Sequence, residues 1–118
     1  MSKIGIVVLS DMESHSDMAR VVNALQVAKE FKEAGDEVEI VFDGGGVVSA
    51  VTIADPDNNL HGLYVKVQDK VTGVCRYCSR AFEVYDKAEA LGLPFLAEYD
   101  QHPSLRRLVQ AGYQIITF

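Results

Sequence analysis

The sequence has little positive charge and no basic run. Its 11 lysines and arginines are outnumbered by 17 aspartates and glutamates, which leaves a formal net charge of −6. Since phosphate binding needs clustered Lys and Arg, nucleic acid is not an expected partner. The sequence also lacks any apolar stretch near the roughly 20 residues that span a bilayer, so no membrane association is expected.

A secretion signal is absent from the first residues as well. The chain runs directly into a strand pattern at Ile4–Leu9, without a basic region, an apolar helix-length segment and a cleavage site in that order. Cytoplasmic residence is therefore the default expectation. In that reducing compartment, closely spaced cysteines are more often catalytic, sulfur-carrying or metal-binding than joined in a structural disulfide.

Cysteine is scarce, and its only two copies form a CxxC motif. Cys75 and Cys78 stand where an apolar run, Val71–Val74, gives way to a predicted amphipathic helix beginning near Ser79. The partial positive charge at the start of a helix stabilises a thiolate. The motif therefore predicts a reactive sulfur. The alternative is that both are small buried side chains, as free cysteines often are.

Each residue of the motif has an expected role. Cys75, as the first side chain to clear the sheet, is expected to attack, and Cys78 to resolve or share the sulfur. Arg76 and Arg80 are expected to support the thiolate through their charge. Tyr77 is expected either to shield the sulfur or to pack against a neighbouring subunit.

The chain offers few partners for a metal site at these cysteines. Structural zinc normally takes four ligands, often from two CxxC-like pairs, and only one pair is present. His15, His61 or His102 would have to complete the site, and none stands at a recognised spacing. No metal ligands are therefore assigned, and no organic cofactor is expected. His102 precedes Pro103 and is expected to cap a helix.

Apolar periodicity predicts a single domain over residues 1–118, in which strands alternate with helices. Strands of the buried type in this order indicate a three-layer α/β/α fold with a mainly parallel sheet of about five strands. The strands are expected at residues 3–9 and 38–42, up to residue 75, at 95–97 as a strand or extended loop, and at 113–118. The helices are expected between Ser16 and Gly35, at 47–54, 60–71 and 79–91, and from Pro103 to before Gly112.

Two helix ends depend on local residues. Ser16 is the expected N-cap of the first helix. Asn59 as an N-cap and Gly73 as a stop favour a helix over residues 60–71, although the apolar alternation there also suits a strand.

In sheets of this kind, functional residues usually lie at the carboxyl ends of the strands. Three polar or unusual segments are expected to meet there: Ser10–Ser16, Asp43–Gly46 and Cys75–Cys78. Asp11 and His15 in the first segment could act as acid or base near the thiols, and a solvated loop histidine is the alternative.

The second segment contains three consecutive glycines. Such glycines expose backbone N–H groups that could cradle a phosphate. Neither GxGxxG nor a P-loop lysine is present, so the favoured interpretation is a tight turn that passes close to a neighbouring loop. The pocket around the thiols is expected to be lined by Ser10, Asp43, Gly44, Gly45, Gly46 and Tyr77.

In this order of elements the chain resembles the DsrE/DsrF-like family of small sulfur-relay and uncharacterised proteins. The resemblance is carried by Ile4–Leu9, Val41–Val47, Val74–Ala81 and Gly112–Phe118. It implies a small α/β/α protein assembled into trimers or hexamers. Some members carry sulfur as a cysteine persulfide, in tRNA thiolation relays or dissimilatory sulfur metabolism. The family's reactive cysteine lies after the third strand, where Cys75 or Cys78 matches it.

The leading functional prediction is therefore a sulfur-transfer protein. Cys75 or Cys78 would accept sulfane sulfur from a donor protein and pass it to an acceptor protein. Two alternatives stay open: a dithiol/disulfide redox or sensor protein using the same motif, and a non-catalytic oligomeric interaction subunit.

Self-association is expected on separate grounds. A small domain with exposed apolar helix faces often buries them against copies of itself. The face expected to do so carries Val47, Val48, Val51 and Ile53.

Overall fold

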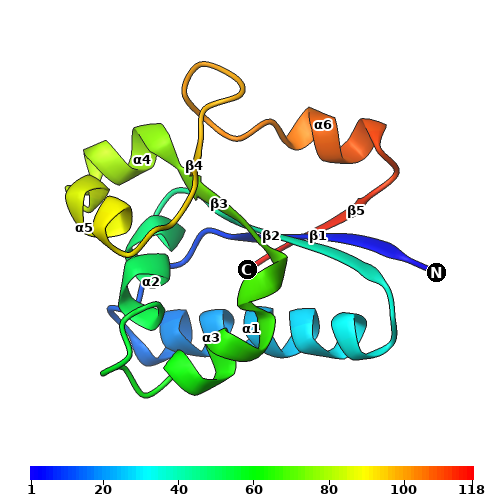
Figure 1. Ribbon diagram of the computed structural model, residues 1–118, viewed down its shortest axis with the longest axis horizontal. Helices are drawn as coiled ribbons and strands as arrows, with labels where there is room; N and C mark the ends of the chain where they lie inside the picture. Colours follow the sequence, from blue (N-terminus) through cyan, green and yellow to red (C-terminus); the bar gives the residue numbers. More distant parts are fainter.

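The computed structural model describes all 118 residues, and its centre is a five-stranded sheet (Figure 1). The strand order is β4-β3-β2-β1-β5, and every neighbouring pair is parallel. The strands are β1 (Lys3–Val8), β2 (Glu37–Phe42), β3 (Val71–Cys75), β4 (Phe95–Leu96) and β5 (Gln114–Thr117). The predicted α/β/α fold is confirmed, and the sheet is parallel throughout.

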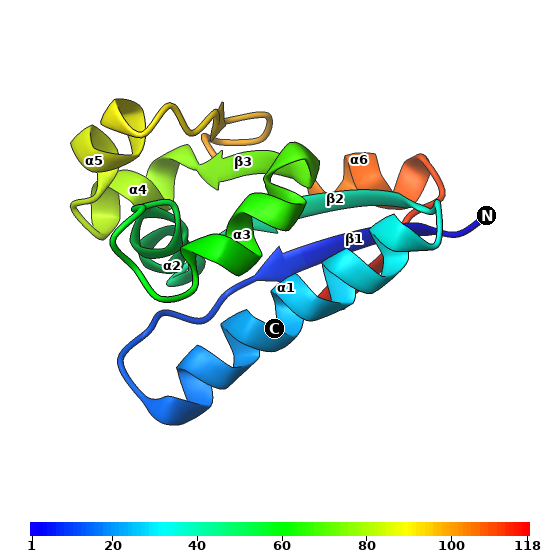
Figure 2. The same ribbon diagram turned by 60° about the horizontal axis from the view of Figure 1, so that its bottom comes forward.

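Helices cover the two faces of the sheet unequally (Figure 2). Strands β1 to β4 follow one another in a single direction across the sheet, so right-handed crossovers place their connecting helices on one face. The return from β4 to β5 places the last helix on the other. The helices are α1 (His15–Glu33), α2 (Gly46–Ile53), α3 (His61–Val67), the 3₁₀ turn η1 (Gln68–Lys70), α4 (Arg76–Ala81), α5 (Tyr85–Ala90) and α6 (Leu105–Gln110). None of them combines the length and the apolar character needed to cross a membrane.

The hydrophobic core is divided by the sheet in the same unequal way. Twenty buried residues fill the side of α1, α2 and α3, whereas the α6 side has three, Val7, Val41 and Leu108. Alternate residues of β1 therefore serve different cores, since Ile6 faces the large one and Val7 the small one.

The apolar helix face that was expected to drive self-association lies in the interior of the folded protein. Val47 and Ile53 of α2 are fully buried, Val51 is 3% exposed, and Val48 packs against the same core. The expectation that these side chains are exposed is wrong, because α2 lies between the sheet and its neighbouring helices. They give no reason to expect an oligomer.

Two expected boundaries of the early helices are displaced. Ser14, rather than Ser16, caps α1, and its hydroxyl accepts a 3.0 Å bond from the Asp17 N–H. The helix expected at residues 60–71 forms only from His61 to Val67. Gly73 lies within β3, where an added Cβ would come 2.5 Å from the Pro94 carbonyl oxygen. This glycine is required for the close approach of the chain entering β4 and does not end a helix.

The helix expected at residues 79–91 is two helices. It begins three residues early, at Arg76, and α4 ends at Ala81. Glu83 has φ of 57°, a left-handed conformation that ends α4 before α5 starts at Tyr85. Apolar periodicity continues through this break, so periodicity alone did not reveal it.

The glycine turn after β2 passes close to the end of β1. A Cβ added at Gly46 would lie 1.9 Å from the Val8 carbonyl oxygen, and one at Gly45 would lie 3.0 Å from that of Leu9. The N–H groups of Gly44 and Gly46 bond to Asp43, at 2.8 Å each, and are not free for a phosphate. The tight-turn interpretation is confirmed.

On the other face, Arg107 of α6 holds the helix to the sheet. Its guanidinium donates to both Glu39 carboxylate oxygens, at 2.8 and 3.3 Å, and its Nε donates to Glu98 at 2.9 Å. Hydrogen bonds from Arg107 and Thr72 keep the pKa of Glu39 below its ordinary value, despite the opposing effect of burial.

We predict that Gly46→Ala lowers the free energy of unfolding by about 3 kcal/mol or more, because the new methyl group has no space beside β1. Urea unfolding measures the change. Gly62→Ala is the matched control, since nothing lies within 4 Å of a Cβ at that helical position. It should stabilise the chain by about 0.5–1 kcal/mol. Equal effects of the two substitutions would contradict this account of the turn.

We predict that Glu39→Gln costs about 1 kcal/mol near neutral pH, since it removes a charge-assisted bond to Arg107. A carboxyl group with a lowered folded pKa stabilises the fold above its unfolded pKa, near 4.5, and loses this effect as pH falls through the folded value. The difference from wild type should therefore shrink as the pH falls from neutral toward 3. Urea unfolding between neutral pH and pH 3 measures it, with the exposed Glu37→Gln as a nearly neutral control.

Candidate functional site

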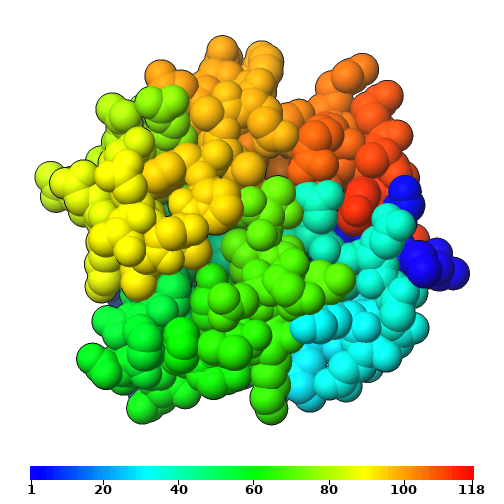
Figure 3. Space-filling view, viewed as in Figure 1, coloured from blue at the N-terminus to red at the C-terminus, as the bar shows by residue number.

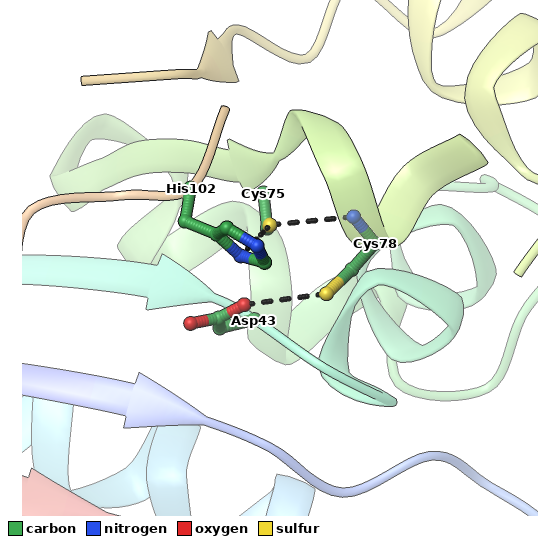
Figure 4. Close-up of side chains that lie close together, drawn as sticks. All are labelled: Asp43, Cys75, Cys78 and His102. Atoms are coloured by element: carbon green, nitrogen blue, oxygen red, sulfur yellow. Dashed lines mark hydrogen bonds between the residues drawn. The ribbon is translucent and has the colours of Figure 1, made fainter. Parts of the chain in front are cut away.

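Three segments meet beyond the carboxyl end of the sheet. Because β2 and β3 are parallel and pair Phe42 with Val74, the residues that follow, Asp43 and Cys75, emerge side by side. The segment between β4 and α6 adds His102. Figure 4 shows the side chains of Asp43, Cys75, Cys78 and His102 pointing toward one another.

Cys75 is the last residue of β3 and the N-cap of α4. Its sulfur accepts a 3.3 Å hydrogen bond from the Cys78 N–H, and its side chain is fully buried. Burial raises the pKa of the Cys75 thiol to about 12, and the carboxylate of Asp43 adds to the rise, against the effect of the Cys78 N–H. The prediction that Cys75 is the first side chain to clear the sheet, with a lowered thiol pKa, is therefore wrong.

Cys78 lies in the first turn of α4 and is partly exposed. Its thiol donates to Asp43 Oδ1 at 3.5 Å. Asp43 is held in place by two bonds of its own, one from the Gly44 N–H to Oδ1 at 2.8 Å and one from its own N–H to the Val8 carbonyl at 2.9 Å. The more accessible thiol is thus the second of the motif, beside a fixed carboxylate.

His102 is the site residue whose position beside the thiols the sequence did not predict. Its Nδ1 lies 3.3 Å from the Cys75 sulfur. It does not cap a helix as expected, because Ser104 caps α6 by accepting a 3.2 Å bond from the Arg107 N–H. The separation of 27 residues from Cys75 matches no motif, and only its place after the fourth strand could have indicated it.

A strained turn holds His102 against α4. Tyr99 and His102 bond to each other through both backbone N–H groups, at 2.9 and 2.7 Å, and Asp100 and Gln101 between them have φ of 47° and 67°. The Tyr77 N–H donates to the Gln101 carbonyl at 3.0 Å, and the Tyr77 and His102 rings lie 4.8 Å apart. The space-filling view shows this orange segment lying against the yellow-green surface of α4 (Figure 3).

Within this chain, Tyr77 makes its contacts with this turn. Its side chain is 53% exposed, and its ring packs on His102. Its backbone fixes the turn that carries the histidine, so within this chain it supports His102.

Neither Arg76 nor Arg80 makes a hydrogen bond to a thiol. The Arg80 guanidinium lies over the Tyr85 ring, 4.6 Å from its centroid, and the side chain is exposed. The Nε of Arg76 is buried and has no hydrogen-bond partner. The hydrogen bonds of the sulfurs involve other groups: the Cys78 N–H donates to the Cys75 sulfur, the Cys78 thiol donates to Asp43, and the Cys75 sulfur pairs with His102 Nδ1.

The loop after β1 lines a different hollow. Ser10, Asp11 and Gly45 border a pocket of about 420 Å³ together with Phe82 and Phe118. His15 is exposed as the first residue of α1. Neither Asp11 nor His15 bonds to a thiol, so the expected acid or base is not among the groups in contact with the sulfurs.

A second pocket borders the four-residue cluster itself. It has a volume of about 520 Å³ and is lined by Asp43, Tyr99, His102, Pro103, Ser104, Leu105 and Arg106. Asp43 and His102 therefore border both the cysteines and a hollow large enough to admit part of another molecule.

The cluster combines groups of complementary chemistry. One ligand-type atom from each of Asp43, Cys75, Cys78 and His102 lies within 4.8 Å of the others. Two free thiols can exchange or carry sulfur, and the carboxylate and imidazole can take part in proton transfer. The argument against zinc was that only one CxxC pair is present and that no histidine stands at a recognised spacing from it. Folding nevertheless brings His102, together with Asp43, to the two cysteines.

Comparison with known proteins agrees with the fold. An uncharacterized protein of Methanocaldococcus jannaschii, MJ0733, is 30% identical over 104 residues, which cover 88% of this chain and 84% of that protein. A solved structure of a conserved protein of unknown function from Bacteroides thetaiotaomicron, BT1422, superposes with a TM-score of 0.67 at 16% identity, over 97% of this chain and 94% of the other. Residues 3–118 match the DsrE/DsrF-like family over nearly the whole sequence. The chain belongs to the DsrE/DsrF-like family.

Proposed function

We propose that this protein is a sulfur carrier and that Cys78 is the residue that accepts the sulfur. The observation that carries the proposal is the partly exposed Cys78 thiol beside Asp43, in the segment after β3 where the resemblance to this family leads us to expect a reactive cysteine. A sulfur donor must bring its own persulfide into contact with the accepting sulfur. The full burial of Cys75 makes it the poorer acceptor.

The transfer requires no external oxidant or reductant. The Cys78 thiolate attacks the outer sulfur of a donor persulfide, the donor's S–S bond breaks, and the donor leaves as a thiolate. Cys78 then carries the sulfane sulfur as a persulfide. In the second transfer, a thiolate of the acceptor protein attacks the outer sulfur of the Cys78 persulfide. The sulfane sulfur passes to the acceptor, and Cys78 leaves as a thiolate.

Asp43 is suited to orient the accepting sulfur. Its carboxylate accepts a hydrogen bond from the Cys78 thiol, and the glycine turn holds that carboxylate in place. Sulfur donor and acceptor proteins are accordingly the proposed partners. A homo-oligomer, trimer or hexamer, stays a prediction of family membership that light scattering at micromolar concentration can check.

A dithiol/disulfide redox function is the second candidate, favoured by the closeness of the two sulfurs. If the Cys75 thiol attacks the inner sulfur of a Cys78 persulfide, a Cys75–Cys78 disulfide forms and hydrosulfide leaves. The carried sulfur is reduced and the two cysteines are oxidised, so the electrons balance. Such a disulfide would need a reductant to restore the thiols.

We predict that metal-free wild type and Cys75→Ser each gain the mass of one sulfur atom when incubated with polysulfide, or with a cysteine desulfurase and cysteine. Cys78→Ser should load at least about tenfold less, since the remaining thiol is buried. Intact-mass spectrometry under non-reducing conditions measures the gain. Loading of Cys78→Ser but not of Cys75→Ser would identify Cys75 as the accepting residue. If neither wild type nor either variant gained sulfur, the carrier function would be refuted.

We predict that iodoacetamide modifies Cys78 at least about tenfold faster than Cys75 in the folded, metal-free protein, because only Cys78 is reachable by solvent. Peptide mass spectrometry after timed quenching gives both rates. In urea the rates should converge, which provides the control. Faster modification of Cys75 in the folded state would contradict the assignment of the accessible thiol.

A further inference from the structure

We infer that Asp43, Cys75, Cys78 and His102 form a binding site for one zinc ion. This inference goes beyond the carrier function and does not depend on it. The four residues come from three separate segments, and each directs one ligand-type atom into the same small volume, with all four atoms within 4.8 Å of one another. Figure 4 shows this convergence.

The distances are near those of a tetrahedral site. Zinc bonds of about 2.0–2.3 Å to O, N and S imply ligand-to-ligand separations of about 3.3–3.8 Å. The Cys75 sulfur and His102 Nδ1 are 3.3 Å apart, and the Cys78 sulfur and Asp43 Oδ1 are 3.5 Å apart. The widest pair needs to close by about 1 Å, which small side-chain rotations can supply.

Backbone groups already hold the ligands in position. The Cys78 N–H donates to the Cys75 sulfur at 3.3 Å, and the Gly44 N–H donates to Asp43 Oδ1 at 2.8 Å. Bonds of this kind orient metal ligands and stabilise their anionic forms. The Tyr99–His102 turn and the Tyr77 ring fix the imidazole. The site is therefore largely formed before any ion arrives.

The donor set selects the class of metal. Two sulfurs and an imidazole are poor ligands for magnesium or calcium, which take oxygen, and good ligands for zinc. Two thiolates and a carboxylate carry three negative charges, of which the ion neutralises two. Binding releases the two thiol protons to solvent and involves no change of oxidation state.

Occupancy of this site would compete with sulfur transfer. A thiolate bound to zinc has its lone pair committed to the ion, so Cys78 cannot attack a donor persulfide at the same time. Zinc would thus act as a reversible block of the same thiols.

We predict that the full chain, treated with chelator and reductant, binds one Co²⁺ per molecule and shows the near-ultraviolet thiolate-to-cobalt absorption. One equivalent of Zn²⁺ should displace it. Each of Cys75→Ser and Cys78→Ser should reduce the absorption and the double variant should abolish it, and His102→Ala and Asp43→Asn should each weaken Zn²⁺ binding at least about tenfold. His15→Ala and Asp86→Asn are matched controls, exposed on other parts of the chain, and should bind as wild type does.

A measurement on the unaltered chain covers the case in which a variant does not fold. In the ¹⁵N spectrum of the histidine rings, Zn²⁺ should shift the His102 Nδ1 resonance and leave those of His15 and His61 unchanged. Absence of the thiolate-to-cobalt absorption, binding well below one equivalent, or no selective shift of His102 would overturn the zinc site. Equal affinity of folded His102→Ala and His15→Ala would do the same.

Sulfur loading of the chelator-treated protein separates the two proposals. Loading without metal binding refutes only the zinc site, and metal binding without loading refutes only the carrier function. Preloading with Zn²⁺ should suppress sulfur gain at least about tenfold in wild type, because metal-bound ligands are largely withdrawn from reaction. Undiminished loading of the zinc-bound chain would overturn the block.

Discussion

The parallel pairing of β2 with β1 and β3 is the constraint on which the rest of the structure depends. It delivers the ends of three strands to one edge of the sheet, and its register sets Phe42 opposite Val74. Asp43 and Cys75 are therefore neighbours before any loop is considered. The same pairing brings the glycine turn so close to Val8 that no side chain fits at Gly46. Geometry of the backbone hydrogen bonds, rather than attraction between the side chains, assembles most of the site.

The last member of the cluster is brought in by a turn that is costly in itself. Asp100 and Gln101 both have left-handed backbones, which cost non-glycine residues about 1–3 kcal/mol each. The turn persists because it is anchored on both sides, by the paired N–H groups of Tyr99 and His102 and by the Tyr77 N–H. Strain of this kind is often found where a side chain must be held in one position, and here the side chain is His102.

The two cysteines show how one short motif can produce two different thiols. One turn of helix separates them, yet Cys75 is enclosed by the core and Cys78 reaches the surface. Desolvation disfavours the charged form of Cys75, and it outweighs the helix start that the motif supplies through the Cys78 N–H. A carrier function and a zinc site use these same sulfurs in different ways. The first needs one accessible nucleophile, and the second needs both sulfurs at once with Asp43 and His102.

Local sequence patterns were enough to predict the class of fold and the region of the chain that carries the chemistry. Buried strand patterns and helical periodicity are local properties, so the parallel sheet, the glycine turn and the Cys75–Cys78 segment at its carboxyl edge were predictable. The folded chain was needed to show which thiol is exposed, that α2 is enclosed, and that His102 joins the cluster. Burial and contact between distant segments depend on how the whole chain packs. No spacing in the sequence predicts that Nδ1 of His102, 27 positions beyond Cys75, lies 3.3 Å from the Cys75 sulfur.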